Sequence, residues 1–154
     1  MESWYFAYGS NLLREQMVMR TGAAGRSDEP PRPAHLPNYE VAFHNIDPQG
    51  PAFANLVSPG VGVLGVLYRC SAADLQVLDG YEAGYERISV AVTDLQGDVV
   101  TAIAYVMVEP SARTAGSPAA EYLARILTGG RQHGLPEAYL RRIAALACGP
   151  VLPQ

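Results

Sequence analysis

The apolar and polar residues follow the two-residue period of β-strands over several short segments. A first strand runs through Tyr5 and Phe6, and the pattern predicts further strands over residues 39–46, 53–57, 61–68, 87–95 and 99–108. Segments 61–68 and 99–108 are apolar on both faces, which indicates strands covered on both sides within a sheet. Most predicted strands follow one another directly along the chain.

Helices are predicted singly between these strands. Residues 12–19 form a short one. Ser71 is a good N-cap for a second, Asp74 completes a capping box with it, and Leu75 and Leu78 then face the core.

Two more helices are expected near the C-terminus. A Ser-Pro pair at 117–118 is typical of a helix start, and a Gly-Gly pair at 129–130 of its end. The last helix begins near Pro136 and ends at the Gly-Pro pair 149–150. Its expected buried stripe comprises Tyr139, Ile143 and Leu146.

Residues 21–37 are polar and rich in Gly, Pro, Arg and Asp, so they are predicted to be a connecting loop. The remaining order does not alternate strand and helix as a doubly wound fold does. We therefore expect an α+β fold, a small curled mixed or antiparallel β-barrel with flanking helices. A chain of 154 residues suits a single domain over residues 1–154.

Composition narrows the function classes. Apolar residues make up 49% of the chain, charged residues 17%, and the net charge is −4. No basic stripe suggests a nucleic-acid partner, and the absence of lysine excludes Schiff-base chemistry. We see no signal peptide and no apolar stretch of membrane-spanning length, so we expect a cytoplasmic protein. In that compartment Cys70 and Cys148 are expected to stay unpaired.

The usual catalytic motifs are missing. His35, His44 and His133 are widely spaced, so no metal site is expected. No dinucleotide or phosphate-loop fingerprint occurs, and no cofactor is expected. Ser10 lacks the Gly-x-Ser-x-Gly setting of a nucleophile elbow, which makes a serine hydrolase the weaker hypothesis.

The first strand leads into Gly9, Ser10 and Asn11 at the start of a helix. Unpaired backbone N–H groups and the positive end of the helix dipole favour a carboxylate or a developing oxyanion at such a turn. Gly9 has no Cβ, so a ligand can approach the backbone closely. Without other motifs, a plain helix cap explains the same residues.

Glu82 is the candidate acid or base. Tyr81, Ala83 and Tyr85 flank it in a glycine-bearing segment, and partial burial raises the pKa of a carboxyl group towards neutrality. An exposed loop acid is the alternative. Glu86, next in sequence to Tyr85, is expected to be a solvated partner of the following arginine.

Several motifs occur in one order along the chain: Tyr-Gly-Ser-Asn-Leu at 8–12, Ala-Asn-Leu-Val-Ser-Pro-Gly at 54–60, Gly-Val-Leu-Tyr at 65–68, Leu-Asp-Gly-Tyr-Glu at 78–82 and Gly-Leu-Pro-Glu-Ala-Tyr at 134–139. Together they resemble the gamma-glutamylcyclotransferase-like family over nearly the whole chain. One departure is Ala83 where the family often has glycine, with a short spacer before Tyr85.

The resemblance implies that the α-amino group of a small gamma-glutamyl amide attacks its own side-chain carbonyl, giving 5-oxoproline and an amine without a cofactor. It assigns Glu82 as the general base and acid. The implied substrate-binding residues are Tyr5, Tyr8, Gly9, Ser10, Asn11, Leu12, Tyr85 and Tyr139. Alternatives are a cyclotransferase acting on a gamma-glutamyl amine or biosynthetic intermediate, and a binding protein of the same fold without turnover. No nucleic-acid or membrane partner is implied, and the oligomeric state is not predicted.

Overall fold

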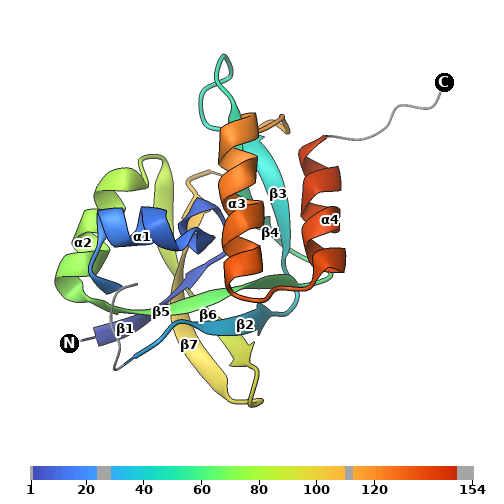
Figure 1. Cartoon of the computed structure of the whole chain (residues 1–154). Helices are drawn as coiled ribbons and strands as arrows, with labels where there is room; N and C mark the ends of the chain where they lie inside the picture. The colour runs from blue at the N-terminus through green and yellow to red at the C-terminus, as the bar shows by residue number, and fades with distance from the viewer. Residues whose placement is uncertain (1, 24–28, 110–112, 149–154) are drawn as a thin grey trace.

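The computed structural model describes residues 2–23, 29–109 and 113–148. Figure 1 shows the elements, which follow in the order β1 (Glu2–Ala7), the 3₁₀ turn η1 (Ser10–Leu12), α1 (Arg14–Arg20), β2 (Arg32–Leu36), β3 (Glu40–Asn45), β4 (Ala52–Val57), β5 (Val63–Ser71), α2 (Ala72–Tyr81), β6 (Tyr85–Asp94), β7 (Val99–Met107), α3 (Ala120–Gln132) and α4 (Glu137–Ala147).

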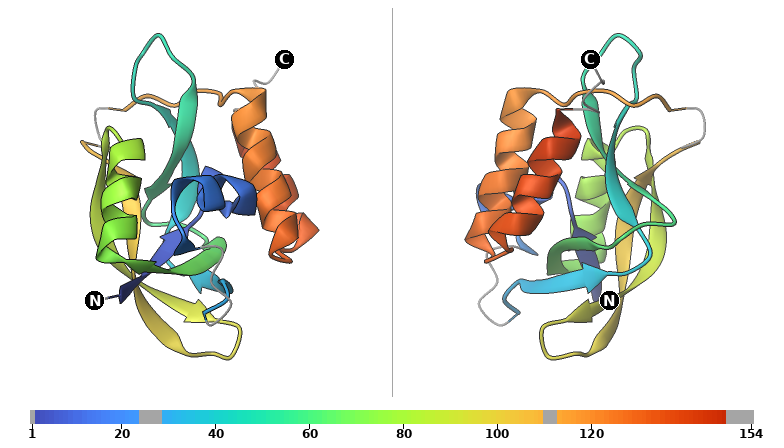
Figure 2. Two further views of the ribbon diagram at one scale, coloured as in Figure 1. Left: turned by 60° about the vertical axis from the view of Figure 1, so that its left-hand side comes forward. Right: turned by 90° about the vertical axis from the view of Figure 1, so that its right-hand side faces the viewer.

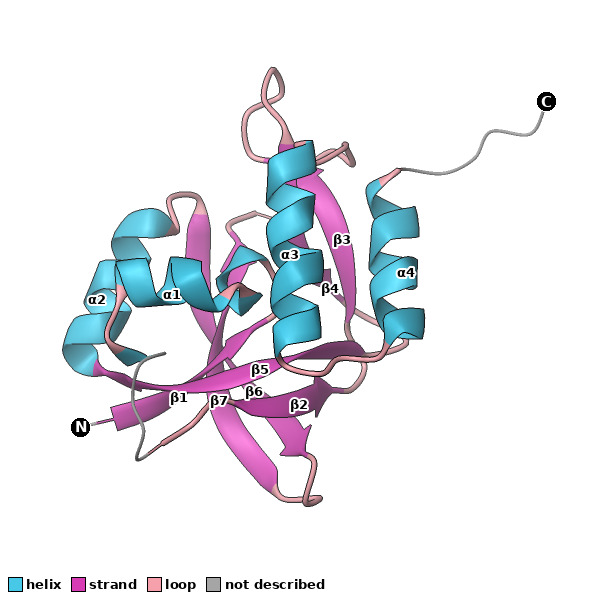
Figure 3. Cartoon of the chain, in the orientation of Figure 1, coloured by secondary structure: helices cyan, strands magenta, loops and turns pink. Residues whose placement is uncertain are grey.

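Five strands close into a barrel in the order β1-β5-β2-β6-β7 (Figure 3). β1 pairs antiparallel with β5 and parallel with β7, and this second pairing closes the mixed sheet. The predicted small barrel is therefore confirmed. β5 lies between β1 and β2, and most of its residues are buried, as its two-sided apolar pattern indicates.

β3 and β4 form a separate antiparallel ribbon. β4 contacts β7, while β3 contacts α4. Two views in Figure 2 show α3 and α4 side by side against this part of the molecule, with α1 and α2 on another side. α3 also packs on η1, so the C-terminal half of the chain reaches the turn that follows β1.

The predicted loop over residues 21–37 is wrong in part, because β2 lies inside it. Ala34 and Leu36 are buried and His35 between them is exposed, which is the alternation of a strand. Pro33 cannot donate a backbone hydrogen bond. Its position is compatible with the sheet, because β6 pairs with β2 only at Ala34 and His35.

The predicted ends of α3 are also wrong. Ala119, not Ser117, is the N-cap, because the carbonyl of Ser117 accepts a hydrogen bond of 3.0 Å from Ala52 N–H and the segment is held against β4. The helix also continues through Gly129 and Gly130. A Cβ on Gly129 would lie 2.3 Å from the carbonyl carbon of Leu12, so glycine permits close packing here instead of ending the helix.

The remaining helix predictions have mixed outcomes. The capping box of Ser71 and Asp74 is confirmed. Segment 12–19 divides into η1 and α1. On α4, Leu146 is 39% exposed, and the predicted end of that helix at 149–150 lies outside the described residues. Within the described residues, neither Cys70 nor Cys148 forms a disulfide bond. None of the helices in the described ranges has the length and apolar character of a membrane span.

Candidate active site

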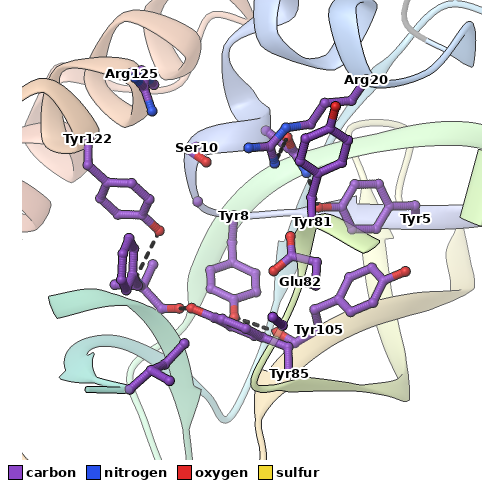
Figure 4. Close-up of a pocket in the computed structure, with 16 residues that line it drawn as sticks. Tyr5, Tyr8, Ser10, Arg20, Tyr81, Glu82, Tyr85, Tyr105, Tyr122 and Arg125 are labelled. Carbon is purple, nitrogen blue, oxygen red and sulfur yellow. Dashed lines mark hydrogen bonds between the residues drawn. The ribbon is translucent and has the colours of Figure 1, made fainter. Parts of the chain in front are cut away.

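A cavity of about 210 Å³ opens where β1, η1, the end of α2 and α3 meet. Figure 4 shows its walls. The lining residues are Tyr5, Tyr8, Gly9, Ser10, Asn11, Arg20, Ile46, Phe53, Ala54, Tyr81, Glu82, Ala83, Tyr85, Tyr105, Tyr122 and Arg125. The structure thus brings together, from distant parts of the sequence, the turn after β1 and the carboxyl of Glu82.

The turn is fixed by its buried Asn11 side chain. Its amide nitrogen donates to Tyr5 Oη at 3.0 Å, while its oxygen accepts from Gln16 at 3.0 Å and from Arg20 at 3.1 Å. Gln16 also donates to Ser10 Oγ at 2.7 Å. Hydrogen bonds in a buried network restrain each member, so these contacts hold the turn in one conformation.

Two further groups hold the turn through its carbonyl oxygens. Tyr68 Oη donates to the carbonyl of Asn11 at 2.9 Å, and His133 Nε2 lies 3.1 Å from the carbonyl of Leu12. No hydrogen bond to another described residue is present for the backbone N–H groups of residues 9–11. These donors belong to residues that line the cavity, as an anion-binding turn requires.

Glu82 is the residue that follows α2, and its position is set by the helix end. Its N–H donates to the carbonyl of Leu78 at 3.0 Å, and its own carbonyl accepts from Tyr85 N–H at 3.0 Å. Burial raises the pKa of the Glu82 carboxyl to about 7, with the charge of Arg20 lowering it and that of Asp79 raising it further. A carboxyl with this pKa exchanges protons readily near neutrality.

Asp79 pairs with Arg87, the partner that was predicted for Glu86. Arg87 Nε donates to Asp79 Oδ1 at 2.8 Å, and Tyr105 Oη donates to the same oxygen at 2.7 Å. The expected pairing of Glu86 with Arg87 is thus replaced by a pair that ties α2 to β6 and β7.

Tyrosine side chains form much of the cavity wall. Tyr85 Oη donates to the carbonyl of Ala54 at 2.6 Å, and the N–H of Ala54 donates to Tyr122 Oη at 3.0 Å. Tyr8 Oη donates to the carbonyl of Tyr105 at 2.5 Å. Burial raises the pKa of each of the tyrosines Tyr8, Tyr85 and Tyr122, so their phenols remain neutral donors near neutral pH.

Leu12 and Tyr139, both expected to bind substrate, do not line this cavity. Leu12 is fully buried beneath α3. Tyr139 is buried on α4, where the guanidinium of Arg142 lies 5.3 Å from its ring. The alternative interpretation of Tyr139 as a packing residue therefore fits its place in the fold.

Sequence reasoning missed several residues of the cavity, above all Arg20 and Arg125 and the tyrosines Tyr81, Tyr105 and Tyr122. Arg20 is the last residue of α1, nine residues after Asn11. This place at the end of the helix that follows the turn was the only local sign that Arg20 could reach the site. Tyr122 and Arg125 lie three residues apart on one face of α3, but no pattern in the sequence shows which face meets the turn.

Comparison with known proteins places the chain among relatives. A profile of the AIG2-like family matches residues 62–143. The gamma-glutamylcyclotransferase of Homo sapiens is 30% identical over 152 residues, which cover 92% of this chain and 77% of that protein. The Mus musculus enzyme of the same name is 29% identical with the same coverage. A solved structure named gamma-glutamyl cyclotransferase has a TM-score of 0.78 and 28% identity, covering 94% of this chain and 88% of its own.

The chain belongs to the AIG2-like family. The resemblance to gamma-glutamylcyclotransferases that the motifs indicate is confirmed, as is the expectation of an enzyme of this type. In this member of the AIG2-like family, the family motifs at 8–12 and 78–82 supply the turn and the carboxyl that face each other across one cavity.

Proposed function

We propose that this protein is a gamma-glutamylcyclotransferase that converts a small gamma-glutamyl amide into 5-oxoproline and a free amine or amino acid, with Glu82 as general base and acid. One observation carries the assignment of residues. The Glu82 carboxyl, with its pKa raised to about 7, lines the same cavity as the turn of residues 9–11.

The reaction needs two protons to move from the attacking to the leaving nitrogen. Glu82 takes a proton from the α-ammonium group of the substrate, and the free amine then attacks the side-chain carbonyl carbon. As the tetrahedral intermediate collapses, the bond to the leaving nitrogen breaks and Glu82 returns the proton to that nitrogen. The attacking nitrogen still carries a second extra proton, which Glu82 then takes and passes to the released amine, so that 5-oxoproline with a neutral amide nitrogen and an ammonium group are formed. A single group can serve both steps because its pKa lies near the operating pH.

The attack places negative charge on the carbonyl oxygen. Residues 9–11 line the cavity, and their backbone N–H groups have no partners among the described residues, so these groups are the proposed donors to this oxyanion or to the substrate α-carboxylate. The network around Asn11 keeps these donors in place before substrate binds. Such preorganisation stabilises the transition state without further rearrangement.

The tyrosine-lined wall contributes by shaping the substrate. Cyclisation requires the α-amine and the carbonyl carbon of one flexible molecule to meet. A cavity that holds the folded conformer replaces much of the entropic cost of that meeting with binding energy. Tyr5, Tyr8 and Tyr85 are the proposed lining residues for the gamma-glutamyl part.

Two other functions are distinguishable by experiment. A serine hydrolase would use Ser10, whose Oγ accepts a hydrogen bond from Gln16. A binding protein without turnover would hold the same ligands and release no product. Ser10→Ala is expected to retain most activity under our proposal. A cytoplasmic location and the absence of nucleic-acid partners remain predictions from the sequence.

The direct test is to incubate the protein with a panel of gamma-glutamyl dipeptides and amides and to measure 5-oxoproline together with the released amine. The proposal predicts equal amounts of both products. Release of glutamate in place of 5-oxoproline would indicate hydrolysis, and tight binding with neither product would indicate a binding protein.

A further inference from the structure

The proposed function leaves the departing amine unassigned. We infer that Arg125 binds a carboxylate on that amine, so that the protein prefers gamma-glutamyl amino acids to gamma-glutamyl amines without a negative charge. This inference rests on the proposed function, but it concerns the leaving group and a residue separate from the one that carries the proton.

Arg125 lines the cavity without an engaged partner. The other lining guanidinium, Arg20, donates to Asn11 Oδ1 and lies 4.3 Å from the centre of the Tyr81 ring. In contrast, Arg125 makes no hydrogen bond or ion pair with any residue in the described ranges. Its donors therefore remain available to a ligand. Guanidinium groups match carboxylates because two parallel N–H groups can meet two oxygens.

The register of α3 along the turn sets the position of Arg125. Near its C-terminal end, Gly129 packs against the backbone of Leu12. About two turns nearer the start of the helix, on the same face, the hydroxyl of Tyr122 lies 3.3 Å from the position that a Cβ of Gly9 would take. Residues three and four apart share a helix face, so Arg125 lies between these two contacts, on the side of the cavity where Figure 4 shows Ser10.

The two guanidinium groups act on different ends of the cavity. Arg20 lowers the pKa of Glu82, whereas Arg125 is not among the described groups that shift it. Figure 4 shows them on opposite sides of the site. The substrate α-amine must meet Glu82 for proton transfer, and the α-carboxylate shares its carbon atom, so Arg20 is the cation nearest to that group.

The leaving amine lies on the far side of the carbonyl carbon from the gamma-glutamyl backbone. A carboxylate on this amine therefore extends away from Glu82, and Arg125 is the lining cation available there. One guanidinium then serves each of the two carboxylates of a gamma-glutamyl amino acid. Because Arg125 is exposed, water screens the interaction, and we expect an effect of up to about fivefold, or about 1 kcal/mol.

The experiment compares gamma-glutamyl-alanine with gamma-glutamyl-alaninamide, which has nearly the same shape but lacks the carboxylate charge. The parent protein should prefer the first by up to about fivefold in kcat/KM, mainly through KM. Arg125→Gln should remove this preference, and Arg125→Lys should keep part of it. Arg141→Gln is the matched control, since Arg141 is an exposed arginine on α4 that does not line the cavity.

A preference that persists in Arg125→Gln, or a parent that does not distinguish the two compounds, overturns the inference while leaving the proposed function intact. Calorimetric titration tests the inference even where the proposed function fails. If no variant forms 5-oxoproline, the proposed function fails, and binding of both compounds to Glu82→Gln still tests Arg125. If Glu82→Gln binds gamma-glutamyl-alanine more tightly than the amide, and the double variant Glu82→Gln/Arg125→Gln binds both equally, carboxylate binding by Arg125 is supported. Equal Kd values for the two compounds in Glu82→Gln contradict it.

Discussion

The guanidinium of Arg20 lowers the pKa of the Glu82 carboxyl, against the burial that raises it to about 7. The charge of Asp79 acts with burial and raises the same pKa. Three contributions of known direction therefore hold one carboxyl near neutrality. Since the base must be ionised before it can accept a proton, activity should fall as the pH drops below this pKa.

Changing either neighbour should move the acid limb of the pH profile of kcat/KM. Arg20→Gln removes a positive charge, so the pKa of Glu82 rises and the limb moves to higher pH. Asp79→Asn removes a negative charge, so the pKa falls and the limb moves to lower pH. Arg20→Lys is the control and should leave the limb nearly in place. Shifts of both neutral variants in one direction would contradict this assignment.

Tyr68→Phe tests how the turn is held. The substitution removes the hydroxyl that donates to the carbonyl of Asn11 and leaves that buried acceptor without this donor. We expect the free energy of unfolding to fall by about 1–3 kcal/mol in urea titrations, and KM to rise. Tyr39→Phe is the control, because the Tyr39 hydroxyl makes no hydrogen bond to a described residue. Equal losses in both variants would refute the role of Tyr68.

Substitution of two helical glycines by alanine should change the stability of the protein in opposite directions. Gly129→Ala places a Cβ 2.3 Å from the backbone of Leu12, so α3 must move away from the turn and both stability and activity should fall. Gly80→Ala in α2 meets nothing within 4 Å, so it should stabilise the protein by about 0.5–1 kcal/mol through helix propensity. Thermal unfolding of both variants checks the pair. A stabilised Gly129→Ala would contradict the close packing of α3 on the turn.

The strands could be predicted because their local patterns were strong. The two halves of the site were singled out by the resemblance to the family, because their local context also fitted a plain helix cap and an exposed acid. The two-sided apolar pattern of residues 61–68 correctly indicated a strand inside the sheet. The partial burial expected for Glu82 agrees with the raised pKa of its carboxyl, although the neighbouring Tyr81 is 55% exposed. β2 was missed because Pro33 and its polar surroundings obscured a short alternation at Ala34 and Leu36. A strand this short gains its stability from pairing with β5 and β6, which no local pattern shows.

The helix ends and the cationic side of the cavity required knowledge of tertiary contacts. Gly129 continues α3 because the helix packs on the backbone of Leu12, whereas glycine in isolation favours a helix end. Ser117 pairs with β4 in place of capping the helix. Arg125 was not a candidate, because its relevance depends on which face of α3 meets the turn.

The role of Glu82 is the central claim, and one comparison tests it most directly. Glu82→Gln keeps the size of the side chain and removes the base, while Glu86→Gln changes an exposed glutamate on β6 that does not line the cavity. Both variants should be compared with the parent by initial rates of 5-oxoproline formation, after circular dichroism has shown that all three are folded.

We predict that Glu82→Gln lowers the rate by about 10²–10⁴-fold, the range typical of general acid–base groups, and that Glu86→Gln retains most of the parent rate. A folded Glu82→Gln variant that forms 5-oxoproline as fast as the parent would contradict the proposed mechanism and make Ser10 the next residue to test.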